Sequence, residues 1–191
     1  MSTTITHKTA TELEAGLESI RQSPRDRGVL QMIVRRPAVG VREVLEHAEL
    51  DVFEGLVGDS WRQRTSRRTA DGSPHPDMQI NIMNSRVVDL VAQHKERWPL
   101  AGDQLFIDID LTDANLPAGT RLQVGTAVLE VTAEPHTGCA KFVERFGVDA
   151  ATFVNSAVGR ELHLRGINAK VVQAGTTSAG DIVIKVKREV R

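Results

Sequence analysis

Alternation of apolar and polar residues predicts several short strands in this chain of 191 residues. Leu105, Ile107 and Ile109 share one face of residues 105–111, and residues 182–187 alternate in the same way. A period of two is typical of a half-buried strand. The same reasoning predicts further strands over residues 30–35, 78–83 and 168–173, and a pair over 121–132 with its turn at 125–126.

Helical spacing of apolar residues occurs in four further stretches. The first covers residues 9–22, where Thr9 or Thr11 is the expected N-cap. The second covers residues 85–93 after Asn84 or Ser85, the third begins at Cys139 and stops at Gly147, and the fourth covers residues 149–158. The spacing of apolar residues over 41–52 suits a helix, but a resemblance to a known family, described below, suggests a strand-like course, so both remain open. Residues 175–181 are expected to form a loop.

About seven strands and four helices result, mostly antiparallel neighbours without a βαβ alternation. This element set favours a mainly β fold with peripheral helices, in the form of a closed β-barrel. The expected division is an N-terminal extension over residues 1–27, carrying one helix, and a barrel domain over residues 28–191. The helix of the extension either lies on the barrel, which we prefer, or forms an oligomer contact.

Composition excludes several classes of function. The net charge is −1, aromatic residues make up 4% and tyrosine is absent, so a nucleic-acid partner is not expected. No apolar run approaches the roughly 20 residues of a membrane span. The chain has one cysteine, which forms no internal disulfide and is consistent with a reducing compartment. Because the N-terminus shows no apolar signal region, we expect a cytoplasmic protein.

That single cysteine, Cys139, is placed where a strand pattern ends and a helix pattern begins. Leu129 and Val131 alternate with polar residues before it, and residues 135–138 read as a turn. Unpaired amides at a helix start stabilise a thiolate, and His136 and Lys141 add positive charge. We therefore expect a partly exposed Cys139 with a lowered pKa at the floor of a pocket. The alternative is a small buried core cysteine.

Residues 128–147 resemble the core motif of the MOSC domain, found at the C-terminus of molybdenum cofactor sulfurases and as standalone bacterial proteins. The resemblance rests on a strand ending in Val-Thr, a proline turn, a cysteine with a lysine two residues later, and a closing Arg-Phe-Gly. Residues 55–59, 118–125, 166–172 and 175–181 resemble further segments of the family in the right order. The likeness covers about residues 28–187. Two positions depart from the family pattern, because His136 and Gly138 stand where arginine and proline are typical.

The resemblance implies a MOSC-type barrel in which Cys139 carries sulfane sulfur as a persulfide or binds the molybdenum of a pterin cofactor. It also implies a sulfur-donor or electron-donor partner, and cofactor-bound members reduce N-hydroxylated compounds. Pyridoxal phosphate belongs to an upstream sulfurase domain in some members, and this chain is too short to contain one, so none is expected. The alternative is a non-enzymatic barrel that binds a small anion or a partner protein. A thiol-redox enzyme is disfavoured because no second cysteine exists to resolve a disulfide.

A basic loop supplies the candidate ligand-binding side chains. Arginine matches phosphate bidentately, so this loop reads as an anion-binding arm or, alternatively, as a solvated surface loop. We expect the loop and His136 to border one pocket. Asp108 and Asp110 lie side by side on a strand and suit either a metal or, more simply, a polar solvent face. The candidate cofactor-binding residues are His136, Lys141, Arg62, Arg64, Arg67, Arg68 and His75.

Overall fold

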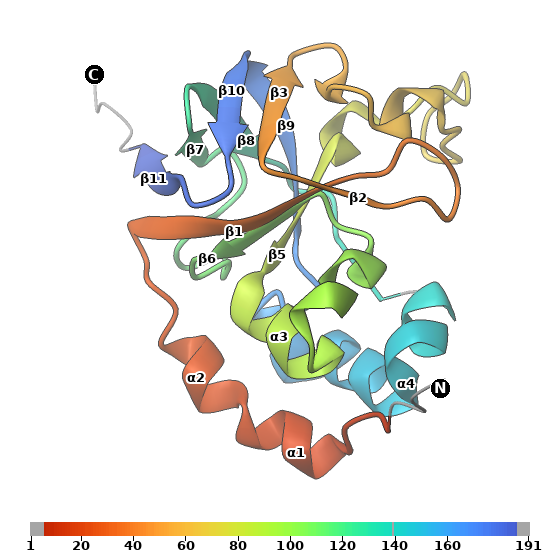
Figure 1. Ribbon diagram of the computed structural model, residues 1–191, viewed down its shortest axis with the longest axis vertical. Coiled ribbons are helices and arrows are strands. Elements are labelled where there is room, and N and C mark those ends of the chain that lie inside the picture. Colours follow the sequence, from red (N-terminus) through yellow and green to blue (C-terminus); the bar gives the residue numbers. More distant parts are fainter. Residues whose placement is uncertain (1–5, 139, 187–191) are drawn as a thin grey trace.

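The computed structural model describes residues 6–138 and 140–186, which form a β-barrel with helices gathered at one end (Figure 1). Seven strands close the barrel in the order β11–β7–β8–β9–β5–β6–β1, since β11 also pairs with β1. These strands are β1 (Arg27–Arg35), β5 (Ile80–Asn84), β6 (Leu105–Asp108), β7 (Arg121–Val124), β8 (Ala127–Val131), β9 (Ile167–Gln173) and β11 (Ile182–Val186). The predicted mainly β barrel with peripheral helices is confirmed.

Four further strands complete the sheets. Strand β2 (Glu43–Leu45) pairs antiparallel with the C-terminal end of β1, and β3 (His47–Asp51) pairs with β4 (Gly55–Leu56) and β10 (Gly175–Ser178). Residues 41–52 therefore contribute strands, which decides between the two expectations for that stretch. The predicted loop over 175–181 is wrong in its first half, because β10 pairs with β3 from Gly175 to Ser178. A Gly-Thr-Thr-Ser strand shows no apolar alternation, so periodicity misses it.

One pair of barrel strands runs parallel. Strand β5 pairs with β6 in parallel, and α3 (Ser85–Ala92) and the 3₁₀ helix η3 (Lys95–Ala101) connect them. The expectation of no βαβ unit is therefore wrong at this place. A parallel neighbour requires a crossover, and α3 supplies it. Asn84 caps α3, and its side chain accepts a hydrogen bond from the amide of Arg86.

The remaining helices surround this crossover. They are α1 (Ala10–Ala15), α2 (Leu17–Arg21), α4 (Ala140–Asn155) and α5 (Ala157–Glu161), with the short 3₁₀ turns η1 (Ser60–Gln63) and η2 (Pro76–Met78) on connecting loops. Thr9, not Thr11, caps α1, in a capping box with Glu12. Leu13 is fully buried among residues of α3 and α4, so the N-terminal helices lie on the helical end of the barrel.

Helix α4 differs from the expected pair of helices. Gly147, with φ of 88°, interrupts it as expected, but the chain resumes the helix at once and continues to Asn155. The predicted end of the fourth helix at residue 158 is wrong, because α4 ends at Asn155 and Ser156 caps a further helix, α5, which contains Gly159. Residues 162–164 form a turn that follows α5.

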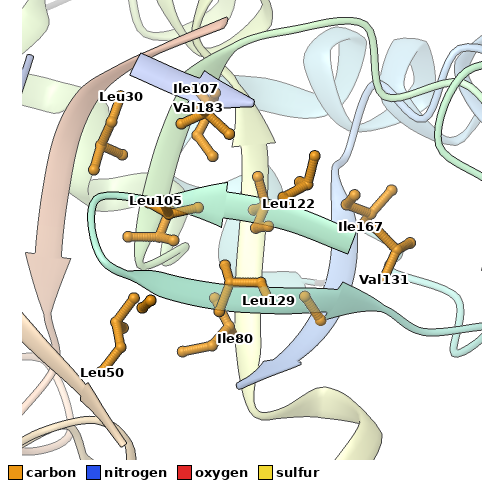
Figure 2. Close-up of a cluster of buried hydrophobic side chains, with 14 of the residues drawn as sticks. Leu30, Leu50, Ile80, Leu105, Ile107, Leu122, Leu129, Val131, Ile167 and Val183 are labelled. Carbon is orange, nitrogen blue, oxygen red and sulfur yellow. The ribbon is translucent and has the colours of Figure 1, made fainter. Parts of the chain in front are cut away.

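Two hydrophobic clusters hold these layers together. The first fills the barrel, where side chains such as Leu105, Leu122 and Leu129 converge from different strands (Figure 2). The second lies between the barrel wall and the helices and includes Phe106, Phe142 and Phe146. Successive side chains of β6 point to opposite faces of the strand. Leu105 and Ile107 therefore belong to the cluster inside the barrel, and Phe106 belongs to the cluster under the helices. No helix in the described part of the chain is long and apolar enough to cross a membrane.

The carboxylates of Asp108 and Asp110 do not form a joint site. Asp108 accepts two hydrogen bonds from Arg86, and Asp110 lies 3.8 Å from Nε of Arg25. Within the described residues, no group of three or more His, Cys, Asp or Glu side chains is arranged to hold a metal ion.

Candidate functional site: a basic cavity beside the segment before Cys139

A cavity of about 390 Å³ opens where the β1–β2 loop, the end of η3 and the start of α4 meet. Its wall is unusually rich in positive charge. The polar lining residues are Arg36, Arg42, Arg64, Asn81, His136, Lys141, Arg145 and Arg165. These residues come from six separate segments of the chain, so only the folded barrel brings them together.

Arg36 forms part of the floor and is almost fully buried. Its guanidinium donates to both carboxylate oxygens of Asp59, each at 2.9 Å, and Nη1 donates to Oδ1 of Asn81 at 2.8 Å. Asp59 also accepts from the amide of Trp61 and thereby caps η1. Because both charges are buried and every carboxylate oxygen is bonded, this pair fixes the position of the floor.

Arg165 forms a second buried pair with Asp103. Its Nη1 donates to the two carboxylate oxygens at 3.0 and 2.8 Å, and its guanidinium lies 5.1 Å from the ring centre of Phe142. Burial raises the pKa of Asp103, while the charges of Arg165 and Arg36 oppose that shift. The Nε atom of Arg165 is buried and has no hydrogen-bond partner in the described structure.

His136 lies beside this second pair with a side chain that is 12% exposed. Its Nδ1 is 3.5 Å from Oδ1 of Asp103 and makes no hydrogen bond within the described residues. Burial, and then the charges of Arg165 and Arg36, lower the pKa of His136 well below its usual value. His136 is therefore neutral at pH 7.

The other cations of the cavity have no carboxylate partner within 4 Å among the described residues; they are Arg42, Arg64, Arg145 and Lys141. Burial, with the charge of Arg36 next, lowers the pKa of Arg64 to about 10, so it remains protonated at neutral pH. Burial also lowers the pKa of Arg42, and the nearby charges of Arg145 and Arg36 add to this shift. These like charges destabilise one another unless an anion lies between them.

Comparison with known proteins identifies the family of this chain. The family model of the MOSC domain matches residues 69–184, which is more than half of the chain. The chain belongs to the MOSC domain family. No match to a curated protein was found.

Solved MOSC-like structures share the fold at low sequence identity. The YuaD protein from Bacillus subtilis is 20% identical, with a TM-score of 0.63, covering 85% of this chain and 97% of its own. YiiM from Escherichia coli is 19% identical with a TM-score of 0.53, covering 84% and 71%. YiiM from Geobacillus stearothermophilus is 14% identical with a TM-score of 0.56, covering 85% and 77%. At this identity the likeness supports the fold alone.

The predicted MOSC site residues divide into two sets. Arg64, His136 and Lys141 line the cavity together. Arg62 instead lies 3.8 Å from Glu54 and lines a separate depression. Cys139 lies outside the described residues.

The other members of the predicted basic loop also lie away from the cavity. Arg68 forms an ion pair with Glu134, and Nε2 of His75 lies 3.7 Å from the same carboxylate. Arg67 is exposed. Glu134 lies three residues after β8, so Arg68 and His75 attach the basic loop to the beginning of the connection between β8 and α4.

Sequence reasoning missed most of the cavity cations, namely Arg36, Arg42, Arg145 and Arg165. Arg42 and Arg165 have no basic neighbour in the sequence, whereas Arg36 follows Arg35 and Arg145 belongs to the Arg-Phe-Gly end of the family-like motif, which was a signal for it. Two local features of the sequence could have pointed to the buried pair of Arg36 and Asp59. Arg36 directly precedes a proline at the end of a strand, and Asp59 follows glycine in the family-like Gly-Asp loop.

Proposed function

We propose that this MOSC protein binds the phosphate group of a pterin molybdenum cofactor in the basic cavity, and that Cys139 supplies a thiolate for molybdenum or for sulfane sulfur. The observation that supports the proposal is the excess of positive charge. Two buried carboxylates neutralise Arg36 and Arg165, while four further cations have no acidic partner in the described chain.

The unpartnered polar atoms of the cavity fit an anionic ligand. Nε of Arg42, Nε of Arg165 and Nδ1 of His136 are buried without a hydrogen-bond partner in the described residues. Leaving a buried donor unpaired costs about 1–3 kcal/mol, and a phosphate oxygen near it relieves that cost. Arginine forks match the oxygens of a phosphate group, and such charge-assisted bonds are roughly twice as strong as neutral ones.

The size of the cavity supports a small ligand. Its volume of 390 Å³ lies within the roughly 300–1,000 Å³ of typical small-molecule sites. A negative charge on this ligand would account for the basic lining on a protein whose net charge is only −1. Focused positive charge in a cleft also raises the association rate of anions.

The residues of this chain divide the proposed work. Arg42, Arg64, Arg145 and Lys141 supply the charge that attracts the phosphate, and Arg36 and Arg165 hold the floor through their carboxylate partners. Neutral His136 offers a ring nitrogen for a proton or a hydrogen bond. Bound molybdenum supplies two-electron chemistry, such as reduction of N-hydroxylated compounds, and a soft thiolate such as that of Cys139 suits this metal.

The direct test is isolation of the protein from a host that makes molybdenum cofactor. We expect molybdenum and pterin fluorescence in the wild type, and loss of both when Arg42 and Arg64 are replaced together by alanine. Arg62→Ala is the matched control, because Arg62 lies outside the cavity, and it should retain both signals. Absence of molybdenum and pterin from the wild-type protein would overturn the proposal.

The cavity cations also suit the second candidate function, a non-enzymatic module for small anions. These cations can bind a small anion without any contribution from the thiol of Cys139. Titration with inorganic phosphate separates the two candidates. Phosphate binding that is blocked by the double alanine variant, in a protein that never acquires molybdenum, favours the module.

A further inference from the structure

The segment that connects β8 to α4 has no regular secondary structure over residues 134–138. Backbone groups in such a segment have no ladder or helix to pair with, so side chains or water must hold them. Two asparagine side chains bond it near its two ends. Nδ2 of Asn168, fully buried in β9, donates to the carbonyl of Glu134 at 3.0 Å.

At the other end, Asn155 bonds both backbone groups of Gly138. The amide of Gly138 donates to Oδ1 of Asn155 at 2.9 Å, and Nδ2 of Asn155 donates to the Gly138 carbonyl at 3.3 Å. The side-chain amide therefore pairs with this residue as a neighbouring strand would. Asn155 is the last residue of α4, and its own carbonyl accepts from Arg160 at 2.6 Å.

The identity of residue 138 is tied to this contact. A Cβ on Gly138 would lie 2.9 Å from Nδ2 of Asn155 and 3.2 Å from Cγ2 of Val154. Proline at this position, as the MOSC pattern has it, carries no amide hydrogen and forms no bond to Oδ1 of Asn155. Glycine at position 138 therefore leaves room for the Asn155 side chain and keeps the amide hydrogen that this side chain accepts.

We propose that Asn155 is a positioning residue, which holds the backbone of Gly138, the residue directly before Cys139 in the sequence. The residues around the cysteine carry this inference. His136 lines the cavity three residues before Cys139, and Lys141 and Phe142 line it two and three residues after. Asn155 therefore fixes the backbone of the connection between two cavity-lining residues, His136 and Lys141.

This inference rests on the proposed role of Cys139 but is tested without cofactor. Iodoacetate carries a negative charge and iodoacetamide does not, so the ratio of their alkylation rates reports the positive field at the only thiol in the chain. The rate with iodoacetate divided by the rate with iodoacetamide should be higher for the wild-type protein than for the free thiol of glutathione. Asn155→Ala should lower it by about 3-fold or more, because cationic clefts raise anion encounter rates by about 10-fold or more.

Ser156→Ala is the matched control. Ser156 is adjacent to Asn155 and caps α5 by accepting from the amide of Gly159 at 2.9 Å, but it makes no bond to Gly138. Its loss should lower the melting temperature and leave the reagent ratio unchanged. A purely structural role of Asn155 would give this same result for Asn155→Ala.

A second variant keeps the inference falsifiable if Asn155→Ala fails to fold. Gly138→Ala should lower the ratio by forcing its Cβ against the Asn155 amide, and the double variant should fall less than the two single effects combined. A wild-type ratio equal to that of glutathione, or unchanged ratios in both single variants, would overturn the inference. If the wild-type protein contains no molybdenum but the variants change the alkylation ratio as expected, only the proposed function is overturned.

Discussion

Arg36 and Asp59 form a buried ion pair in which the guanidinium donates to both carboxylate oxygens at 2.9 Å. The side chains are 3% and 0% exposed. The amide of Arg36 also donates to Asp59, at 2.9 Å. Asp59 is the last residue of the family-like Gly-Asp loop over residues 55–59, so this loop supplies the carboxylate that holds Arg36 at the cavity.

Removing Asp59 should strongly destabilise the protein. Asp59→Ala leaves a buried arginine without its partner, which costs about 3–5 kcal/mol in comparable pairs. Urea denaturation measures the loss. Glu54→Ala is the control, because Glu54 forms only an exposed contact of 3.8 Å with Arg62 and should change the free energy of unfolding by less than about 1 kcal/mol. Equal effects of the two variants would contradict this account.

The N-terminal cap distinguishes two threonines two positions apart. Thr9→Ala should lower the free energy of unfolding by about 0.5–2 kcal/mol, because the Thr9 hydroxyl caps α1 and exchanges bonds with Glu12. Thr11→Ala should stay within about 0.5 kcal/mol, as for other exposed surface positions. Thermal or urea unfolding of both variants provides the comparison, and a larger loss for Thr11→Ala would refute the assignment.

His136 should make stability depend on pH. Its pKa is lowered in the folded state, so the unfolded chain binds more protons at acidic pH. Stability from this source is therefore complete above the unfolded value of about 6.5 and decreases as pH falls below it. His136→Gln should remove this part of the decrease, while the exposed His94→Gln should not. Urea unfolding between pH 7.5 and 5 would test the difference, with parallel curves for His136→Gln and wild type counting against it.

Cys139→Ser should separate the thiol from the anion site. An alcohol stays protonated at neutral pH and is a poor ligand for a soft metal, so molybdenum retention or sulfur transfer should be lost. Binding of inorganic phosphate should persist, because the cavity cations do not include the thiol. Metal analysis and phosphate titration on the same variant make the comparison. A lower melting temperature with unchanged activity per folded molecule would instead identify a structural cysteine.

Salt should distinguish the cavity from an apolar pocket. Phosphate affinity should fall as ionic strength rises, because the four cavity cations without an acidic partner in the described chain act largely through charge. Lys141→Ala should reduce both the affinity and its salt dependence, and Lys95→Ala, outside the cavity, should change neither. Calorimetric titration at about 50 and 300 mM salt gives both quantities, and a salt-independent affinity would show that charge is not the main attraction.

The sequence by itself determined the local elements and the kind of fold. Alternation located the strands around Leu105, Leu122 and Ile184, and helical spacing with a capping asparagine located α3. These features depend on neighbours two to four residues apart, which a sequence displays directly. His136 and Lys141 were also found, because they are close in sequence to the single cysteine.

Only the tertiary structure decided which charges meet. Arg36, Arg145 and Arg165 are far apart in the chain, and their convergence depends on barrel closure and on the parallel pairing of β5 with β6. The structure also places Arg64 and Arg62 in different depressions, although a single residue lies between them in the sequence. A contact in space is set by the path of the whole backbone, and the spacing of residues along the chain records only its local part.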